Sequence, residues 1–92
     1  HLYEEECYYV LAGTGQVRIG EVMHPVAAGD FLGFPANGAA HVLRNTGEAP
    51  LVFLMARTKL VQDVCDYPDK GKRLYMNGDE EAFVNLGDVI RL

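Results

Sequence analysis

The chain has no tryptophan, only two cysteines and no long hydrophobic run. Cys7 and Cys65 are too few for a disulfide framework, so we interpret them as free thiols of a protein in the reducing cytoplasm. An apolar run such as residues 51–56 is far shorter than the ~20 residues that a helix needs to cross a bilayer. The sequence therefore predicts neither a disulfide-stabilised scaffold nor a membrane partner.

Basic residues are also few. Lys and Arg number 8 against 13 Asp and Glu, which gives a formal net charge of -5. Such a surface repels a phosphate backbone, so we expect no nucleic-acid partner. The 92 residues are 49% hydrophobic and 23% charged, a composition typical of one globular domain. A small-molecule ligand and a second copy of the chain remain as the expected partners.

The sequence does have closely spaced turn signals made of Gly, Pro and Asn. Between them lie short runs rich in β-branched, aromatic and aliphatic residues, at 7–12, 16–19, 22–26, 31–34, 41–45 and 51–58. Short strands at such spacing predict an all-β sandwich or barrel. The pattern is weaker after residue 58. There we predict a C-terminal wrapping segment, 59–92, with short strands at 73–76 and 82–86, the latter alternatively a helical turn.

Alternation along these runs assigns side chains to faces. Tyr8 and Val10 share a face with Glu6, and we interpret both, together with Leu43, as filling of the interior. Residues 51–56 are apolar on both faces, which predicts a strand buried between two layers or covered by a second subunit. The second alternative predicts a homodimer.

Three side chains stand out as metal-ligand types: His1, Glu6 and His41. Imidazole and carboxylate groups together suit a divalent transition metal, which could be Zn, Fe, Mn, Ni or Cu. Composition alone allows many such triples, so the spacing has to decide.

The spacing resembles the two motifs of the cupin family. His1, four residues, Glu6, six residues and Gly13 are similar to the end of the first motif. The positions that match the second motif, in order, are Gly29, Pro35, Gly38, His41 and Asn45. One departure is visible, because two residues separate Pro35 from Gly38 where the family usually has one. The resemblance covers residues 1 to about 58.

The resemblance implies a double-stranded β-helix, a small jelly-roll barrel that holds a metal inside its open end. By matching position, His1, Glu6 and His41 would be the metal ligands. The family's first motif usually has another His two residues before the position of His1. We therefore expect either that the chain begins inside the motif and lacks N-terminal strands, or that three protein ligands suffice. The segment 67–72 is similar to a tail of small single-domain bacterial cupins.

The remaining polar candidates have structural interpretations. We expect Glu4 and Glu5 to form a solvated acidic edge, and His24 to lie on the surface. Cys7 is predicted to be a small buried hydrophobe, and Asn45 to fix a turn. Three arginines could anchor an anionic substrate, although alternation places none of them beside the metal: Arg18, Arg44 and Arg57.

Three classes of function stay open. The first is a metal-dependent enzyme acting on a small molecule, such as a dioxygenase, an isomerase or a decarboxylase. No catalytic residue beyond the three ligands is apparent. The second is a non-catalytic module that binds or senses a small molecule. The third is a structural dimer with a vestigial site, because one fold supports many functions.

Overall fold

The computed structural model describes all 92 residues, and it is nearly all β, with 57% of the residues in strands and 7% helical. The elements are β1 (Glu6–Ala12), β2 (Thr14–Ile19), β3 (Val22–Ala27), β4 (Phe31–Phe34), β5 (His41–Asn45), β6 (Val52–Arg57), β7 (Gln62–Tyr67), η1 (Pro68–Lys70), β8 (Lys72–Asn77), β9 (Glu80–Asn85) and η2 (Leu86–Asp88). The prediction of an all-β chain is confirmed. The two helices have three residues each, and neither could reach across a membrane.

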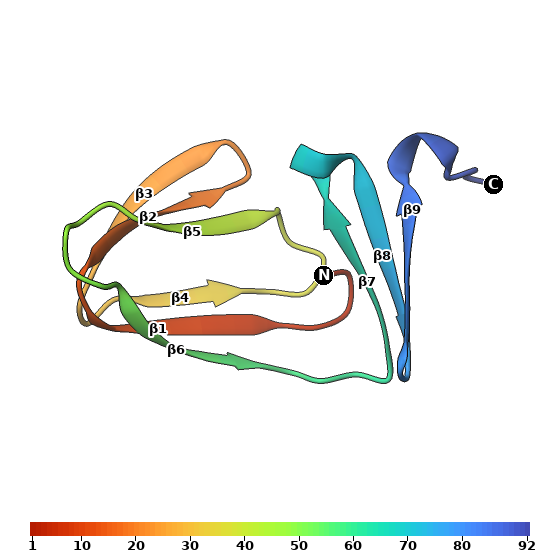
Figure 1. Cartoon of the computed structure of the whole chain (residues 1–92). Helices are drawn as coiled ribbons and strands as arrows, with labels where there is room; N and C mark the ends of the chain where they lie inside the picture. Colours follow the sequence, from red (N-terminus) through yellow and green to blue (C-terminus); the bar gives the residue numbers. More distant parts are fainter.

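Strands β1 to β6 form two antiparallel sheets that face each other (Figure 1). One sheet has the order β4-β1-β6, and the other has the order β3-β2-β5. The chain passes between the sheets after β1, β3, β4 and β5, as it does in a jelly roll. The predicted jelly-roll fold is therefore confirmed for this part of the chain.

A small apolar core lies between the two sheets. One side chain from each of four strands is buried there: Val10, Val17, Val26 and Phe34. Tyr8 and Leu43 pack against this cluster, as predicted from the alternation. The turn from β1 to β2 requires Gly13, whose φ is +87° and whose missing Cβ would lie 2.5 Å from the carbonyl oxygen of Pro50.

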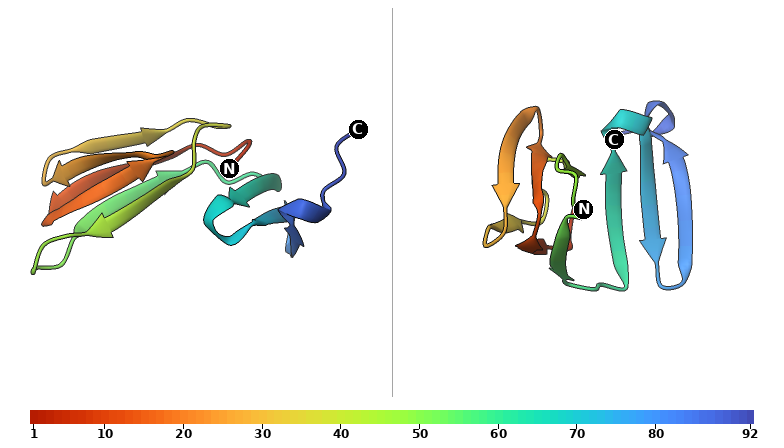
Figure 2. Two further views of the ribbon diagram at one scale, coloured as in Figure 1. Left: turned by 90° about the horizontal axis from the view of Figure 1, so that it is seen from above. Right: turned by 60° about the vertical axis from the view of Figure 1, so that its left-hand side comes forward.

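Strands β7, β8 and β9 form a third antiparallel sheet that stands at one end of the two facing sheets (Figure 2). We expected this segment to wrap around the barrel, whereas residues 62–85 form a layer of their own. The predicted strands at 73–76 and 82–86 correspond to β8 and β9, and the helical alternative applies only to η2. The amide of Leu2 donates to the carbonyl of Val64 at 2.7 Å, so the N-terminal segment lies against β7.

Strand β6 lies at the edge of its sheet, and all six of its residues are exposed. Leu54 and Met55 are 60% and 55% exposed. The expectation that this run is buried between two layers of the same chain is therefore wrong. Strand β6 pairs only with β1, and its side chains stay exposed on both faces of the sheet. Cover by a second subunit stays a prediction.

The third sheet carries an ion pair whose pH dependence can be predicted. Arg73 donates from Nε and Nη2 to the two carboxylate oxygens of Asp66, at 2.7 and 3.1 Å. These hydrogen bonds, together with the guanidinium charge, hold the pKa of Asp66 below its usual value. A lowered pKa in the folded state adds stability above the unfolded value of about 3.9, and this stability is lost as pH falls through the folded pKa.

We expect Asp66→Asn to lower the denaturant midpoint at pH 7, and we expect the difference from the wild type to be smaller at pH 3, below the unfolded pKa. Urea unfolding followed by circular dichroism at both pH values measures it. A difference that is unchanged between pH 7 and pH 3 would contradict this account of the ion pair.

Candidate metal centre

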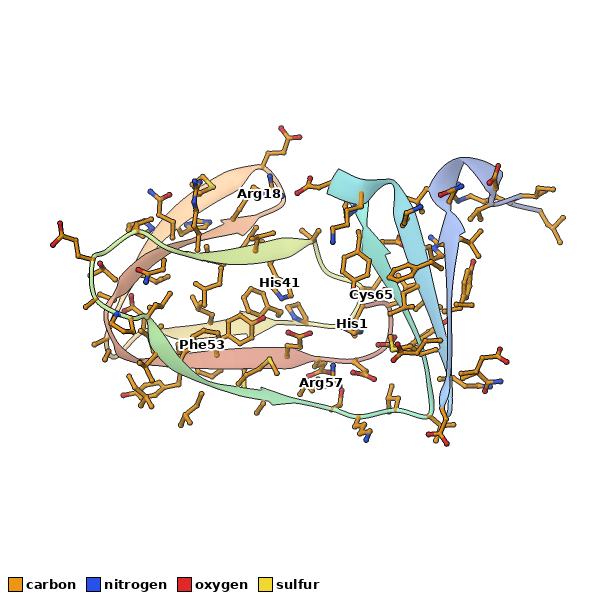
Figure 3. All side chains as sticks on the ribbon, viewed as in Figure 1. His1, Arg18, His41, Phe53, Arg57 and Cys65 are labelled. Atoms are coloured by element: carbon orange, nitrogen blue, oxygen red, sulfur yellow. The ribbon has the colours of Figure 1, made fainter.

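Strand register brings two of the predicted ligands to the same end of the sandwich. Glu6 begins β1 and pairs with Phe34 at the end of β4. His41 begins β5 and pairs with Ile19 at the end of β2. Both side chains therefore lie at the end that faces the third sheet. His1 precedes β1, and Figure 3 shows its side chain at this same end, near that of His41.

Glu6 is the residue that links the two histidines. Its Oε1 lies 3.2 Å from Nε2 of His1, and its Oε2 lies 3.5 Å from Nε2 of His41. The three side chains are only 10 to 17% exposed. The structure thus brings together the three residues selected from the sequence, with each histidine beside a different oxygen of the one carboxylate.

Two aromatic residues fix this arrangement. The ring of His41 stacks on the ring of Phe34, with centroids 3.6 Å apart and planes 9° from parallel. The hydroxyl of Tyr8 donates to Oε2 of Glu6 at 3.1 Å and lies 3.4 Å from Nε2 of His41. These contacts limit the rotamers of both His41 and Glu6.

Burial and the Glu6 carboxylate together shift the pKa of Tyr8. Burial raises the pKa of Tyr8 to about 12, and the negative charge of Glu6 and the hydrogen bond to it act in the same direction. At neutral pH the phenol is therefore protonated, and it remains a hydrogen-bond donor to Glu6.

Two further carboxylates lie beside His1. Glu4 is only 4% exposed, so the expectation of a solvated edge is wrong for Glu4, although Glu5 is exposed. The amide of Leu60 donates to Oε2 of Glu4 at 3.2 Å, while Oε1 has no hydrogen-bond partner and lies 3.9 Å from Nε of Arg57. Alternation carries no signal for Glu4, because this residue precedes the first strand.

The second carboxylate, Asp63 on β7, was missed by sequence reasoning. Its side chain is fully buried, and Oδ2 lies 2.5 Å from Nδ1 of His1. One ligand atom from each of His1, Glu4 and Asp63 falls within 4.8 Å of the other two. This group is more compact than the predicted one, and 62 residues separate His1 from Asp63 in sequence. The signal that could have found Asp63 is the alternation along β7, because Asp63 shares a face with Cys65, the other buried residue of that strand.

Two adjoining cavities open at the site. A small one of about 180 Å³ is lined by His1, Glu4, Glu6 and His41 with apolar neighbours. A larger one of about 760 Å³ extends from His1, Glu6 and His41 toward the third sheet. The polar residues that line its far side are Arg18, Glu21, Asp66, Tyr67, Asp69 and Lys70. The second cavity has room for a small polar molecule beside the three predicted ligands.

The structure also places the other candidates. Arg18 lines the larger cavity, where it forms an ion pair with Asp69, so it lies closer to the site than alternation indicated. His24 is exposed, as expected, and so is Arg44. Asn45 fixes its turn, because its side chain accepts from the amide of Gly47 and donates to a carbonyl, which confirms that prediction.

The two cysteines are unpaired, as predicted, although their environments differ from one another. Cys65 is buried on β7, whereas Cys7 is only half-buried. Cys7 faces away from the space between the two sheets that holds Val10. The prediction that Cys7 is a small buried hydrophobe is therefore only partly correct.

Comparison with known proteins agrees with this geometry. The cupin domain model matches residues 1–57. The chain belongs to the cupin family. It is 46% identical over 55 residues to Protein SchB of Streptomyces halstedii, a match that covers 58% of this chain and 39% of SchB.

Two solved structures resemble nearly the whole cupin chain. A provisionally named sugar phosphate isomerase of Acidithiobacillus ferrooxidans has a TM-score of 0.96 and 45% identity, covering 99% of this chain and 58% of that one. A cupin-superfamily sugar phosphate isomerase of Silicibacter pomeroyi has a TM-score of 0.87 and 23% identity, covering 99% and 59%. The second likeness shows the fold alone. The chain spans about half the length of these relatives.

The raised pKa of Tyr8 can be measured directly. The pKa of Tyr67 is raised as well, so we expect ultraviolet titration of the folded protein to show a transition near pH 12 that Tyr8→Phe reduces by the absorbance of one tyrosine. Tyr9→Phe is the matched control, because Tyr9 is adjacent on β1 and 45% exposed. If Tyr8→Phe leaves the amplitude of the transition near pH 12 unchanged, Tyr8 is not the hydrogen-bonded phenol described above.

Proposed function

We propose that this cupin binds one divalent transition metal through His1, Glu6 and His41. The observation that supports the proposal is the single carboxylate of Glu6, which lies 3.2 and 3.5 Å from the Nε2 atoms of the two histidines. Two imidazoles and one carboxylate fit the preferences of Zn, Fe, Mn, Ni and Cu alike. This set also leaves coordination positions for a ligand from the larger cavity.

The more compact group of His1, Glu4 and Asp63 is a weaker candidate for the same metal. Both oxygens of Asp63 are already engaged by N–H donors, at 2.5 to 3.0 Å. Glu4 accepts from Leu60, and its second oxygen is shielded from solvent. Although that second oxygen of Glu4 has no hydrogen-bond partner, a metal there would have to replace hydrogen bonds of the buried Asp63, which is costly.

We further propose that the chain is part of an isomerase that acts on a sugar phosphate. The neighbour from Acidithiobacillus ferrooxidans supports this reaction class, because it is 45% identical and superimposes on 99% of this chain. The larger cavity supports a substrate of this size, and it contains two cations, Arg18 and Lys70, that could bind an anionic group.

The residues of the site would have separate roles. A divalent metal held by His1, Glu6 and His41 would supply Lewis-acid polarisation of a substrate carbonyl. Tyr8 holds its proton at the hydroxyl and keeps Glu6 oriented by donating to Oε2. Phe34 fixes the plane of His41 and covers one face of that ring from water. Arg18 would exchange its present partner, Asp69, for the anionic group of the substrate.

The metal assignment is tested by elemental analysis of protein purified without a His-tag or chelator. We expect about one equivalent of a transition metal per chain. His41→Ala should weaken binding by more than the roughly 10–100-fold that loss of a supporting residue costs. His24→Ala is the matched control, because His24 is exposed on β3. Unchanged metal content in His41→Ala would overturn the assignment.

The reaction is tested with the same proteins. Sugar phosphates are incubated with the metal-loaded wild type, and interconversion of aldose and ketose forms is followed by NMR. We expect turnover that is lost with a chelator and in His41→Ala. Tight binding of a sugar phosphate without turnover would instead favour a non-catalytic binding module.

We also propose that the cupin is a homodimer through the outer face of the β4-β1-β6 sheet. In this sheet Phe31 pairs with Tyr9, and Tyr9 pairs with Leu54, so three exposed apolar side chains form one row. The chain exposes 6574 Å², against roughly 5,300 Å² for a folded monomer of 10.2 kDa. The excess exceeds the ~800 Å² that each partner buries in a standard interface.

The dimer is tested by sedimentation at micromolar concentration. We expect a dimer for the wild type and a monomer for Leu54→Lys, because a lysine at the β6 end of the row would be desolvated in the interface without a partner. Val61→Lys is the control, since Val61 is 74% exposed and lies outside this sheet. A monomeric wild type would contradict the proposal.

The two free thiols support a reducing, cytoplasmic location, which we keep as part of the proposal.

A further inference from the structure

Asp63 is an acidic residue buried where an apolar one would be expected. It lies on β7 in the third sheet, beyond residues 1–57 that match the cupin domain, and its side chain has no exposed area. Burial of a carboxylate is unfavourable unless hydrogen bonds compensate for the lost water. The partners of Asp63 therefore indicate why the position holds an acid.

Three N–H groups surround this carboxylate. Backbone amides of Tyr3 and Val64 donate to Oδ1, at 3.0 and 2.8 Å. Nδ1 of His1 lies 2.5 Å from Oδ2. A carboxylate that already accepts from two amides acts as an acceptor toward His1 as well, so the hydrogen lies on Nδ1.

The tautomer of His1 follows from this contact. With the hydrogen on Nδ1, the lone pair of the neutral ring is on Nε2. Nε2 is the atom that lies 3.2 Å from Oε1 of Glu6, within the group that includes His41. Asp63 thus turns the free nitrogen of His1 toward the other two predicted ligands.

We propose that Asp63 is a positioning residue for the metal centre: it fixes the tautomer and ring orientation of His1, so that the third sheet contributes to a site whose ligands all come from the cupin sandwich. Carboxylates that accept from the second nitrogen of a ligating histidine raise both its basicity and the affinity for the metal. This inference rests on the metal site proposed above. The approach of β7 to the N-terminal segment, through Leu2 and Val64, holds the contact in place.

The decisive variant is Asp63→Asn, which keeps the shape of the side chain. Its carbonyl oxygen can still accept from Tyr3 and Val64, but its amide then donates to Nδ1 of His1. The hydrogen of His1 is thereby forced onto Nε2, which can no longer ligate. We expect the dissociation constant for Zn²⁺ or Co²⁺ to rise about 10–100-fold, with the circular dichroism spectrum of the metal-free protein unchanged.

The matched control is Asp79→Asn, which removes the same charge from an exposed turn of the same sheet. We expect metal affinity within about twofold of the wild type, because a distant exposed charge has little effect on the site. An Asp63→Asn protein that folds and binds metal as tightly as this control would overturn the proposal.

A second measurement needs no variant. Long-range ¹H–¹⁵N correlation spectra of the wild-type protein report which nitrogen of His1 carries the hydrogen. We expect a hydrogen on Nδ1 both with and without metal, and an Nδ1 that carries no hydrogen would overturn the proposal even if Asp63→Asn fails to fold.

The outcomes also separate this inference from the proposed function. If the wild type binds no metal, the proposed metal site is wrong. The position of the hydrogen on His1 then still shows whether Asp63 orients the imidazole ring. If metal is lost in Glu4→Gln but retained in His41→Ala, the metal lies in the group of His1, Glu4 and Asp63. Asp63 would then be a ligand, which overturns its positioning role.

Discussion

The imidazole of His1 is held between two carboxylates, and the two parts of the chain meet at this contact. Asp63 binds it from the third sheet, while Glu6 faces its other nitrogen from the first strand of the sandwich. A buried carboxylate next to an imidazole is stable only when its remaining lone pairs are satisfied. The amides of Tyr3 and Val64 do this for Asp63, so the backbone around His1 and β7 is constrained as well.

This constraint explains why so few buried side chains suffice to organise the site. The core between the sheets consists of four buried residues, and a core of this size specifies strand pairing more firmly than side-chain orientation. Orientation at the open end comes instead from polar contacts and from the stacking of His41 on Phe34. Tyr8 connects the apolar core with the polar contacts of the site, because it packs on the core and donates to Glu6.

Much of the fold and part of the site could be predicted from the sequence. Turn residues and alternation are local signals, and they were sufficient for β1 to β6, β8 and β9 and for the inward side of Tyr8 and Val10, although β7 was not predicted. The motif spacing selected His1, Glu6 and His41, which the strand register brings to one end of the sandwich. The extra residue in the second motif also has a structural role: Asn37 has φ +57°, and its amide donates to the carbonyl of His1 at 3.0 Å.

What the sequence could not predict depends on contacts between distant segments. Burial of Glu4 is set by Leu60 and Arg57, and that of Asp63 by His1 and Tyr3, pairs separated by more than 50 residues. Alternation within one strand carries no information on such pairs. The same limit applies to β6. Its apolar faces predicted that something covers the strand, but they did not indicate whether a layer of the same chain or a second subunit does so. A site assembled at the junction of two sheets can therefore be located by the motif of one sheet, while the residue that orients its ligand belongs to the other.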